Sequence, residues 1–146
     1  MNEIQQQSDL ERLREFVTLL SNGNFAEAEQ YISDEMTIHE PYALPYGGEL
    51  HGHEGWATFR SIFRETWKHW VDGPIWYAEA AGTVVKENIV TATSRRTGKT
   101  CMTRLAEFFT FRDGMIVESR IYYQDIPAVL SAITPDPEPL LRPSTE

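Results

Sequence analysis

The sequence predicts an α+β fold in which helices come first and an antiparallel sheet follows. Up to about residue 70, apolar residues recur at the spacing of amphipathic helices, and from residue 75 onward the chain is rich in β-branched and aromatic residues. Turn signals divide the second half, and Asp113-Gly114 is typical of a two-residue hairpin. Helices that precede such a meander are expected to pack on one face of its sheet.

Length and charge narrow the class of protein. A chain of 146 residues is most simply one domain, which forms a core without disulfides or a structural metal. The single Cys101 suits a reducing compartment, and a net charge of -9 argues against a nucleic-acid-binding module. No apolar run reaches the ~18 residues of a membrane span, and the N-terminus lacks the apolar segment of a signal peptide. We therefore expect a cytoplasmic protein that binds neither nucleic acid nor a membrane.

Two helices are expected before the first strand. Ser8 and Glu11 have the spacing of a capping box, and the apolar stripe that follows ends near Gly23. A short helix over 25–32 comes next. Residues 1–8 are polar and expected to be disordered, whereas residues 9–133 form the single domain.

A strand over 36–40 and a third helix are expected next. Pro41 ends the strand, and the glycine-rich residues 42–55 read as a long loop. An aromatic stripe then predicts a helix over 56–70, which stops near Gly73. Its members at helical spacing are Trp56, Phe59, Phe63, Trp67 and Trp70. The first three pack on the sheet or line a pocket mouth, and the last two belong to the core or to an oligomer contact.

The second half is expected to form four strands, over 75–85, 89–95, 100–112 and 115–123. Turns at 87–88, 97–98 and 113–114 separate them. A last helix covers 126–133, and residues 134–146, which hold four of the eight prolines, form a tail or an arm onto a partner subunit.

Four stretches, in this order, resemble one superfamily: GNFAEAEQYISDEMTIHEP, LPYGG, a Gly-led aromatic helix and FFTFRDGMIVESRIYYQD. The chain is similar over about residues 9–133 to the SnoaL-like and ketosteroid-isomerase-like superfamily, which has a nuclear-transport-factor-two-like fold. The resemblance implies a curved antiparallel sheet, wrapped by three N-terminal helices into a cone-shaped half-barrel with an internal apolar pocket. It also implies isomerisation, cyclisation, dehydration or epoxide opening without a cofactor, and a homodimer packed through the open sheet face.

Glu40 is the first candidate catalytic residue. It ends a strand just before Pro41, and the resemblance implies that it stands where the isomerases carry a proton-shuttling Asp. An apolar pocket destabilises a carboxylate and raises its pKa towards that of a base at neutral pH. The alternative is a surface glutamate at a strand end.

Asp125 is the second candidate. It ends the row of the last strand that contains Tyr123. The resemblance implies that it acts as acid or base, as in SnoaL-like cyclases and limonene-epoxide-type hydrolases. The alternative is a cap on the helix over 126–133, which Pro127 favours.

Glu107 is the third candidate. Its neighbours on the same strand face are apolar: Leu105, Phe109 and Phe111. A carboxyl buried among them stays protonated unless it is paired. The resemblance then implies that it donates a hydrogen bond to an enolate or carbonyl oxygen. The alternative is an exposed ion pair with Arg104 or Arg120.

The isomerases also carry a donating Tyr on the first helix, and that position falls on Phe16. Losing one oxyanion donor typically costs about 10²–10³ in rate, so a true steroid isomerase is not expected. Tyr46, Tyr122 or Tyr123 would supply a hydroxyl from another direction. We expect aromatic side chains to hold the substrate, namely Phe16, Trp56, Phe59, Phe63 and Tyr123.

His39 lies beside Glu40 on the opposite strand face, as a proton carrier near neutral pH or as a structural residue. His51 and His53 form an H-x-H pair that, with His39 and Glu40, could hold a divalent metal. No further ligand falls at a spacing that fixes the geometry, so no metal site is expected.

The leading hypothesis is a cofactor-independent acid–base enzyme that acts on a hydrophobic, oxygenated small molecule. Glu40 and Asp125 would move protons or orient water, and Glu107 or Tyr46 would support a developing oxyanion. The alternative is a non-catalytic ligand-binding or assembly module of the same fold. A third hypothesis is a metal-dependent activity through the histidines.

Overall fold

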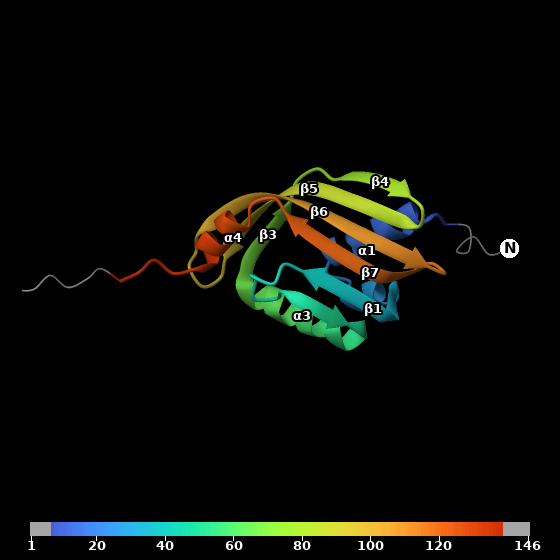
Figure 1. The fold of residues 1–146 in the computed structure, drawn as a ribbon, viewed down its shortest axis with the longest axis horizontal. Helices are drawn as coiled ribbons and strands as arrows, with labels where there is room; N and C mark the ends of the chain where they lie inside the picture. The colour runs from blue at the N-terminus through green and yellow to red at the C-terminus, as the bar shows by residue number, and fades with distance from the viewer. Residues whose placement is uncertain (1–6, 139–146) are drawn as a thin grey trace, which may run out of the picture.

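The structure is a computed structural model that describes residues 7–138 (Figure 1). The described residues form four helices and one sheet of seven strands. Two helices precede the first strand, the third lies between the second and third strands, and the fourth follows the last strand. The helices are α1 (Asp9–Ser21), α2 (Phe25–Glu29), α3 (Gly52–Thr66) and α4 (Ile126–Ile133). The strands are β1 (Ile32–Glu40), β2 (Gly48–His51), β3 (Trp67–Asp72), β4 (Trp76–Ala80), β5 (Thr83–Ser94), β6 (Thr100–Arg112) and β7 (Met115–Tyr123).

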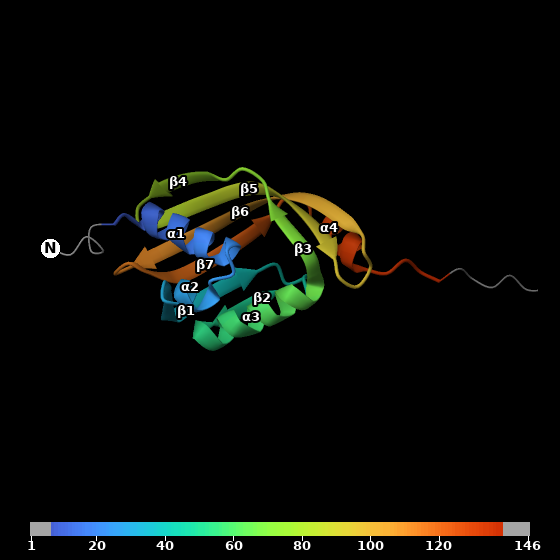
Figure 2. The same cartoon turned by 180° about the vertical axis from the view of Figure 1, so that it is seen from behind.

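The sheet runs in the order β2-β1-β7-β6-β5-β3, and β4 pairs with β5 beside β3. All pairs are antiparallel except β1 with β7, which is parallel. Helices α1, α2 and α3 lie on one side of the curved sheet (Figure 2). The predicted α+β fold, with a curved and mostly antiparallel sheet and N-terminal helices, is confirmed.

The ends of α1 follow the local signals. The Ser8 hydroxyl accepts from the Glu11 amide at 3.1 Å, and Gly23 has a left-handed φ of 76°. The predicted helix over 25–32 is shorter than expected, because α2 ends at Glu29 and Ile32 already begins β1. Ile32 pairs with Ile116 of β7, so a strand far along the chain overrides the local helical spacing.

The predicted loop over 42–55 was wrong in part. It contains β2, which pairs with β1 and so covers the edge of the sheet, and it contains the first turn of α3. Gly48, the first residue of β2, and Gly52, which follows β2, have φ of 100° and 65°. Glycine adopts this conformation without strain. The chain can therefore turn sharply into and out of a four-residue strand.

The predicted helix over 56–70 was also wrong at its end. It stops at Thr66, and Trp67 and Trp70 belong to β3, where they pair with β5. The Arg95 side chain donates to the carbonyl oxygens of Arg64 at 3.0 Å and Trp67 at 3.2 Å. These bonds satisfy carbonyls that a helix leaves free at its C-terminus, so the strand can begin at once.

The predicted turn at 87–88 does not exist. The chain turns instead at Ala81 and Gly82, both with positive φ, and β5 then runs without interruption to Ser94. Asn88 is buried within β5 rather than exposed at a turn. The expected bounds of β6 and β7 are confirmed, and their hairpin uses Asp113 and Gly114 with φ of 53° and 76°.

The ends of the chain lie partly outside the description. Residues 1–6 and 139–146 are not described, so the predicted disorder of 1–8 and the tail over 134–146 fall largely there. The predicted helix over 126–133 is α4. No helix within residues 7–138 is long and apolar enough to cross a membrane.

Candidate functional site

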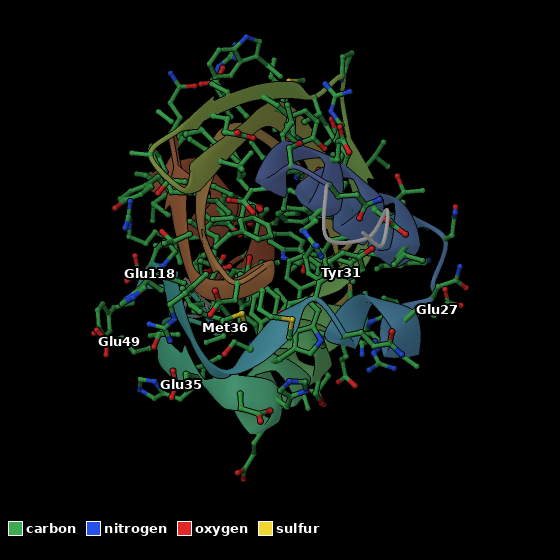
Figure 3. The ribbon with its side chains drawn as sticks, turned by 90° about the vertical axis from the view of Figure 1, so that its right-hand side faces the viewer. Glu27, Tyr31, Glu35, Met36, Glu49 and Glu118 are labelled. Atoms are coloured by element: carbon green, nitrogen blue, oxygen red, sulfur yellow. The ribbon has the colours of Figure 1, made fainter. Side chains whose placement is uncertain are left out.

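A cavity of about 710 Å³ lies between the helices and the inner face of the sheet. The view along the molecule shows the elements arranged round this interior, with Met36 inside and Glu49 and Glu118 outside (Figure 3). Its wall is mostly apolar and includes Met36, Ile38 and Leu105 from the sheet. An apolar cavity with few polar groups is the usual form of a small-molecule site.

The five aromatic residues predicted to hold a ligand all line this cavity: Phe16, Trp56, Phe59, Phe63 and Tyr123. Their rings contact one another, with 5.8 Å between the centroids of Phe16 and Trp56 and 5.8 Å between those of Trp56 and Phe59. The Trp56 Nε1 atom is buried with no hydrogen-bond partner among the described residues. It can therefore donate to a polar atom of a ligand.

Glu40 and Glu107 are the two carboxyl groups that face the cavity from β1 and β6. Glu40 is 5% exposed, and its Oε2 atom has no hydrogen-bond partner among the described residues. Burial, and secondarily the charge of Glu107, raise the pKa of Glu40 well above its usual range. Burial also raises the pKa of Glu107, which Lys86 lowers and Asp72 raises to smaller extents. The site therefore holds two interacting carboxyls of different surroundings.

Lys86 is the functional candidate that sequence reasoning missed. It is 6% exposed and pairs with Glu107 across β5 and β6, so both side chains point into the cavity. Its Nζ atom donates to Asn88 Oδ1 at 3.3 Å, and Asn88 Nδ2 donates to Asp72 Oδ1 at 2.7 Å. Alternation along β5 would have placed Lys86 and Asn88 on the inner face. The false turn at 87–88 hid that alternation.

A hydrogen-bonded chain of three side chains closes one part of the wall. Trp67 Nε1 donates to the Tyr46 hydroxyl at 3.1 Å, and the Tyr46 and Tyr123 hydroxyls lie 2.8 Å apart. An indole N–H can only donate, so the Tyr46 oxygen accepts from Trp67. Either of the two hydroxyls can be the donor in the bond between Tyr46 and Tyr123. Tyr123 lines the cavity, whereas Tyr46, which is 1% exposed, lies behind the wall.

Tyr46→Phe is expected to lower the free energy of unfolding by about 1–3 kcal/mol, because it leaves the buried Trp67 N–H without an acceptor. Urea unfolding measures the change. Tyr122→Phe is the matched control, because Tyr122 is 54% exposed, and it should change stability by less than about 0.5 kcal/mol. Equal effects of the two substitutions would mean that the buried hydrogen bond contributes nothing.

Comparison with known proteins places this fold in a family. Residues 13–119 match the SnoaL-like domain. The chain belongs to the SnoaL-like domain family. No curated protein sequence matches it significantly.

Solved structures resemble this SnoaL-like domain over most of their length. An NTF2-like protein from Burkholderia xenovorans is 16% identical, with 86% of this chain and 95% of that chain covered and a TM-score of 0.79. A candidate polyketide cyclase from Pseudomonas putida is 14% identical, with 88% and 99% covered and a TM-score of 0.75. TerC, co-crystallized with polyporic acid, is 19% identical, with 86% and 97% covered and a TM-score of 0.77. At these identities the similarity shows the fold alone.

Asp125 does not line the cavity of the SnoaL-like domain. Asp125 is exposed, and its Oδ1 atom accepts from the Ala128 amide at 3.0 Å at the start of α4. Of the two roles predicted for this residue, the geometry is that of the helix cap. Cys101 lies close enough for the Asp125 charge to raise the pKa of its thiol, after the larger effect of burial.

Asp125→Ala is therefore expected to lower the free energy of unfolding by about 1 kcal/mol, because α4 loses its cap. Asp125→Asn should retain nearly all of the stability, since an amide oxygen accepts the same bond. Thermal and urea unfolding of both variants provide the measurement. A loss of turnover in the stable Asn variant, once a substrate is known, would instead assign chemistry to the carboxylate.

The three histidines considered for proton transfer or metal binding lie apart, each with its own partners. His39 lies on the outer face of the sheet, 3.5 Å from a Glu49 oxygen and 3.4 Å from a Glu118 oxygen. His51 contacts the Thr37 hydroxyl, and His53 contacts the Ile32 carbonyl oxygen at 2.8 Å. Within residues 7–138, no group of three His, Cys, Asp or Glu side chains is placed to hold a metal ion.

Proposed function

We propose that the protein is a cofactor-independent acid–base enzyme that acts on a hydrophobic, oxygenated small molecule. The observation that carries the proposal is the pair of interacting carboxyls, Glu40 and Glu107, on the wall of a mostly apolar cavity. Buried carboxyls cost stability unless they are compensated. Two carboxyls whose pKa values are raised by burial are suited to act as a general acid and a general base.

The surroundings favour different roles for the two carboxyls. Burial raises the pKa of Glu40 more strongly than that of Glu107, and among the described residues Glu40 has no ion-pair partner, so its protonated form is the more favoured of the two. Glu107 has Lys86 beside it, whose positive charge stabilises the carboxylate. Glu107 is then the base that accepts a proton from the substrate, and Glu40 is the acid. This reverses the roles expected from the sequence.

Tyr123 supplies the second donor to a developing oxyanion. Its side chain lines the cavity, and when Tyr46 is the donor between the two hydroxyls, the Tyr123 proton is available to a substrate oxygen. Tyr123 is also close enough to Glu40 for that charge to raise its pKa, after the larger effect of burial. Glu40 and Tyr123 would together donate to one substrate oxygen, which makes up for the missing hydroxyl at Phe16.

Relatives of the same fold support this class of activity without defining the reaction. One similar structure is a candidate polyketide cyclase, and another is a candidate polyketide cyclase from Xanthomonas campestris. TerC, of the same fold, was co-crystallized with polyporic acid. Cyclisation, isomerisation, dehydration and epoxide opening can all use a general acid and a general base placed next to a bound substrate.

Isotope exchange tests the proposal even while the natural product is unidentified. A panel of hydrophobic ketones is incubated with the protein in heavy water, and a panel of epoxides in water labelled with oxygen-18. Mass spectrometry then detects exchange at carbon or label in a diol. We expect incorporation that requires Glu107, so that Glu107→Gln abolishes it. Ligands that bind tightly but are never exchanged or opened would favour the ligand-binding alternative.

A further inference from the structure

The mouth of the cavity is basic, although the protein as a whole is acidic. We define the cationic mouth as Arg60, Arg64 and Lys68, which line the cavity where α3 passes into β3. Arg64 and Lys68 are exposed although they line the cavity, so the cavity opens here. Lys86 and Arg95 bring the basic residues of the wall to five, against three acidic residues. In the whole chain the proportion is the reverse, 13 to 22.

Within the described part of the chain, the side chains of the cationic mouth form no ion pair with a carboxylate. The charge of Glu29 acts on Arg60 only weakly, after burial and the like charge of Arg64. Arg60 and Arg64 lie one helical turn apart, a spacing at which like charges destabilise a helix. A bound anion would relieve this repulsion.

An aromatic ring holds one side chain of the cationic mouth in place. The guanidinium carbon of Arg60 lies 3.6 Å from the centroid of the Phe25 ring, so the side chain is held at the opening by a stacking contact. Phe25 at the start of α2 and Ser21 at the end of α1 also line the cavity, and α1 and α2 lie on the same face of the sheet as α3 (Figure 2). Further aromatic residues of the wall include Phe59 and Phe63.

From this arrangement we infer that the cavity takes an amphiphilic organic anion, with its apolar body inside and its anionic group at Arg60, Arg64 and Lys68. The inference deepens the proposed function and relies on it only in identifying the cavity as the ligand site. The anionic group would be a carboxylate, phenolate or sulfonate, all of which accept hydrogen bonds from guanidinium groups. The cationic mouth would then orient the ligand, so that its uncharged oxygenated part reaches Glu40 and Glu107.

Two fluorescent probes of nearly the same shape test this inference. Anilinonaphthalene sulfonate is anionic, whereas N-phenylnaphthylamine has the same rings without the sulfonate. We expect the double variant Arg60→Gln/Arg64→Gln to raise the Kd of the sulfonate about tenfold, and to change the Kd of the neutral probe less than about twofold. Added salt should weaken the binding of the anionic probe and leave the binding of the neutral probe unchanged.

Two matched variants make the result specific. Arg60→Lys/Arg64→Lys keeps both charges and should retain most of the sulfonate affinity. Arg112→Gln removes one charge from the outer surface, where Arg112 pairs with Glu35, and should have little effect. Unchanged sulfonate binding in the double Gln variant, equal loss of both probes, or an equal loss in Arg112→Gln would each overturn the inference. Binding needs no turnover, so a failed exchange screen would refute the proposed activity and leave this result standing.

Discussion

Glu40→Gln is expected to reduce turnover by about 10²–10⁴-fold, the range that general acid catalysis contributes. The amide has the shape of the neutral acid but cannot transfer a proton. The Kd for the ligand should change little, because the substitution leaves the apolar wall intact. The comparison of kcat and Kd on a substrate found by isotope exchange measures the effect.

Glu118→Gln is the control for this substitution. Glu118 lies on the outer face of the same sheet, where it pairs with Arg120 and His39, so its loss should leave turnover unchanged. Full activity of Glu40→Gln would remove Glu40 from the mechanism. Equal losses in the two variants would point to a general effect of charge.

Glu40→Gln should also change how the free energy of unfolding depends on pH. The ordinary pKa of the Glu40 carboxyl is 4.5, and burial raises it well above that value in the folded protein. Between these two values the folded state keeps a proton that the unfolded state releases, so stability falls as pH rises. Glu40→Gln cannot titrate, so its stability should fall less over this window.

Urea unfolding from pH 5 upward compares the two proteins, and the difference in free energy should grow with pH until Glu40 ionises in the folded state. Glu65→Gln provides the control for the loss of a surface carboxylate, because Glu65 is exposed. Parallel pH profiles of the wild type and Glu40→Gln would show that burial does not shift this carboxyl.

Gly47→Ala is the second substitution of large expected effect, and it acts on stability. Gly47 ends a pair of turns in which the Leu44 amide donates to the Pro41 carbonyl oxygen, and the Gly47 amide donates to that of Leu44. A Cβ atom on Gly47 would lie 2.0 Å from the Pro41 oxygen and 2.9 Å from the Leu44 oxygen. Both neighbours are backbone atoms, so the turns must move, at a cost of about 3 kcal/mol or more. Urea unfolding measures it.

Gly98→Ala separates this collision from ordinary backbone strain. Gly98 has a φ of 73° and open space round its Cβ position, so Ala should cost only about 1–2 kcal/mol for the left-handed conformation. A cost for Gly47→Ala no greater than that for Gly98→Ala would contradict the predicted collision. Because Gly47 follows Tyr46 directly and closes the loop after Glu40, turnover should fall with stability.

Parts of the structure depend on neighbours a few residues away, and these could be predicted. The cap of α1 needs only Ser8 and Glu11, and the hairpin between β6 and β7 needs only Asp113-Gly114 with its flanking alternation. Alternation with apolar neighbours in a strand made Glu40 and Glu107 candidates for the inner face, with exposed positions as the alternatives. Helical spacing singled out Trp56, Phe59 and Phe63, and the family resemblance singled out Phe16.

Other parts depend on pairing with distant strands. The end of α3 at Thr66 depends on β5, which pairs with Trp67 and Trp70 and supplies Arg95 to the free carbonyls. The strand β2 forms because β1 offers it an edge. The spacing of residues within 42–55 and 56–70 contains no information about these partner strands. The local glycine and aromatic patterns therefore predicted the wrong boundaries.

The sequence by itself determined the α+β class and the family resemblance, and it made Glu40 and Glu107 candidates beside Asp125, because alternation and turn chemistry act locally. Only the tertiary structure decided what each acid can do. The register of β5 against β6 places Lys86 beside Glu107, whereas Glu40 has no counter-charge among residues 7–138. The packing of α3 and β3 likewise places Arg60, Arg64 and Lys68, which are close in the sequence, on the wall of the cavity. Electrostatic roles follow from distances between groups far apart in the chain, and those distances exist only after folding.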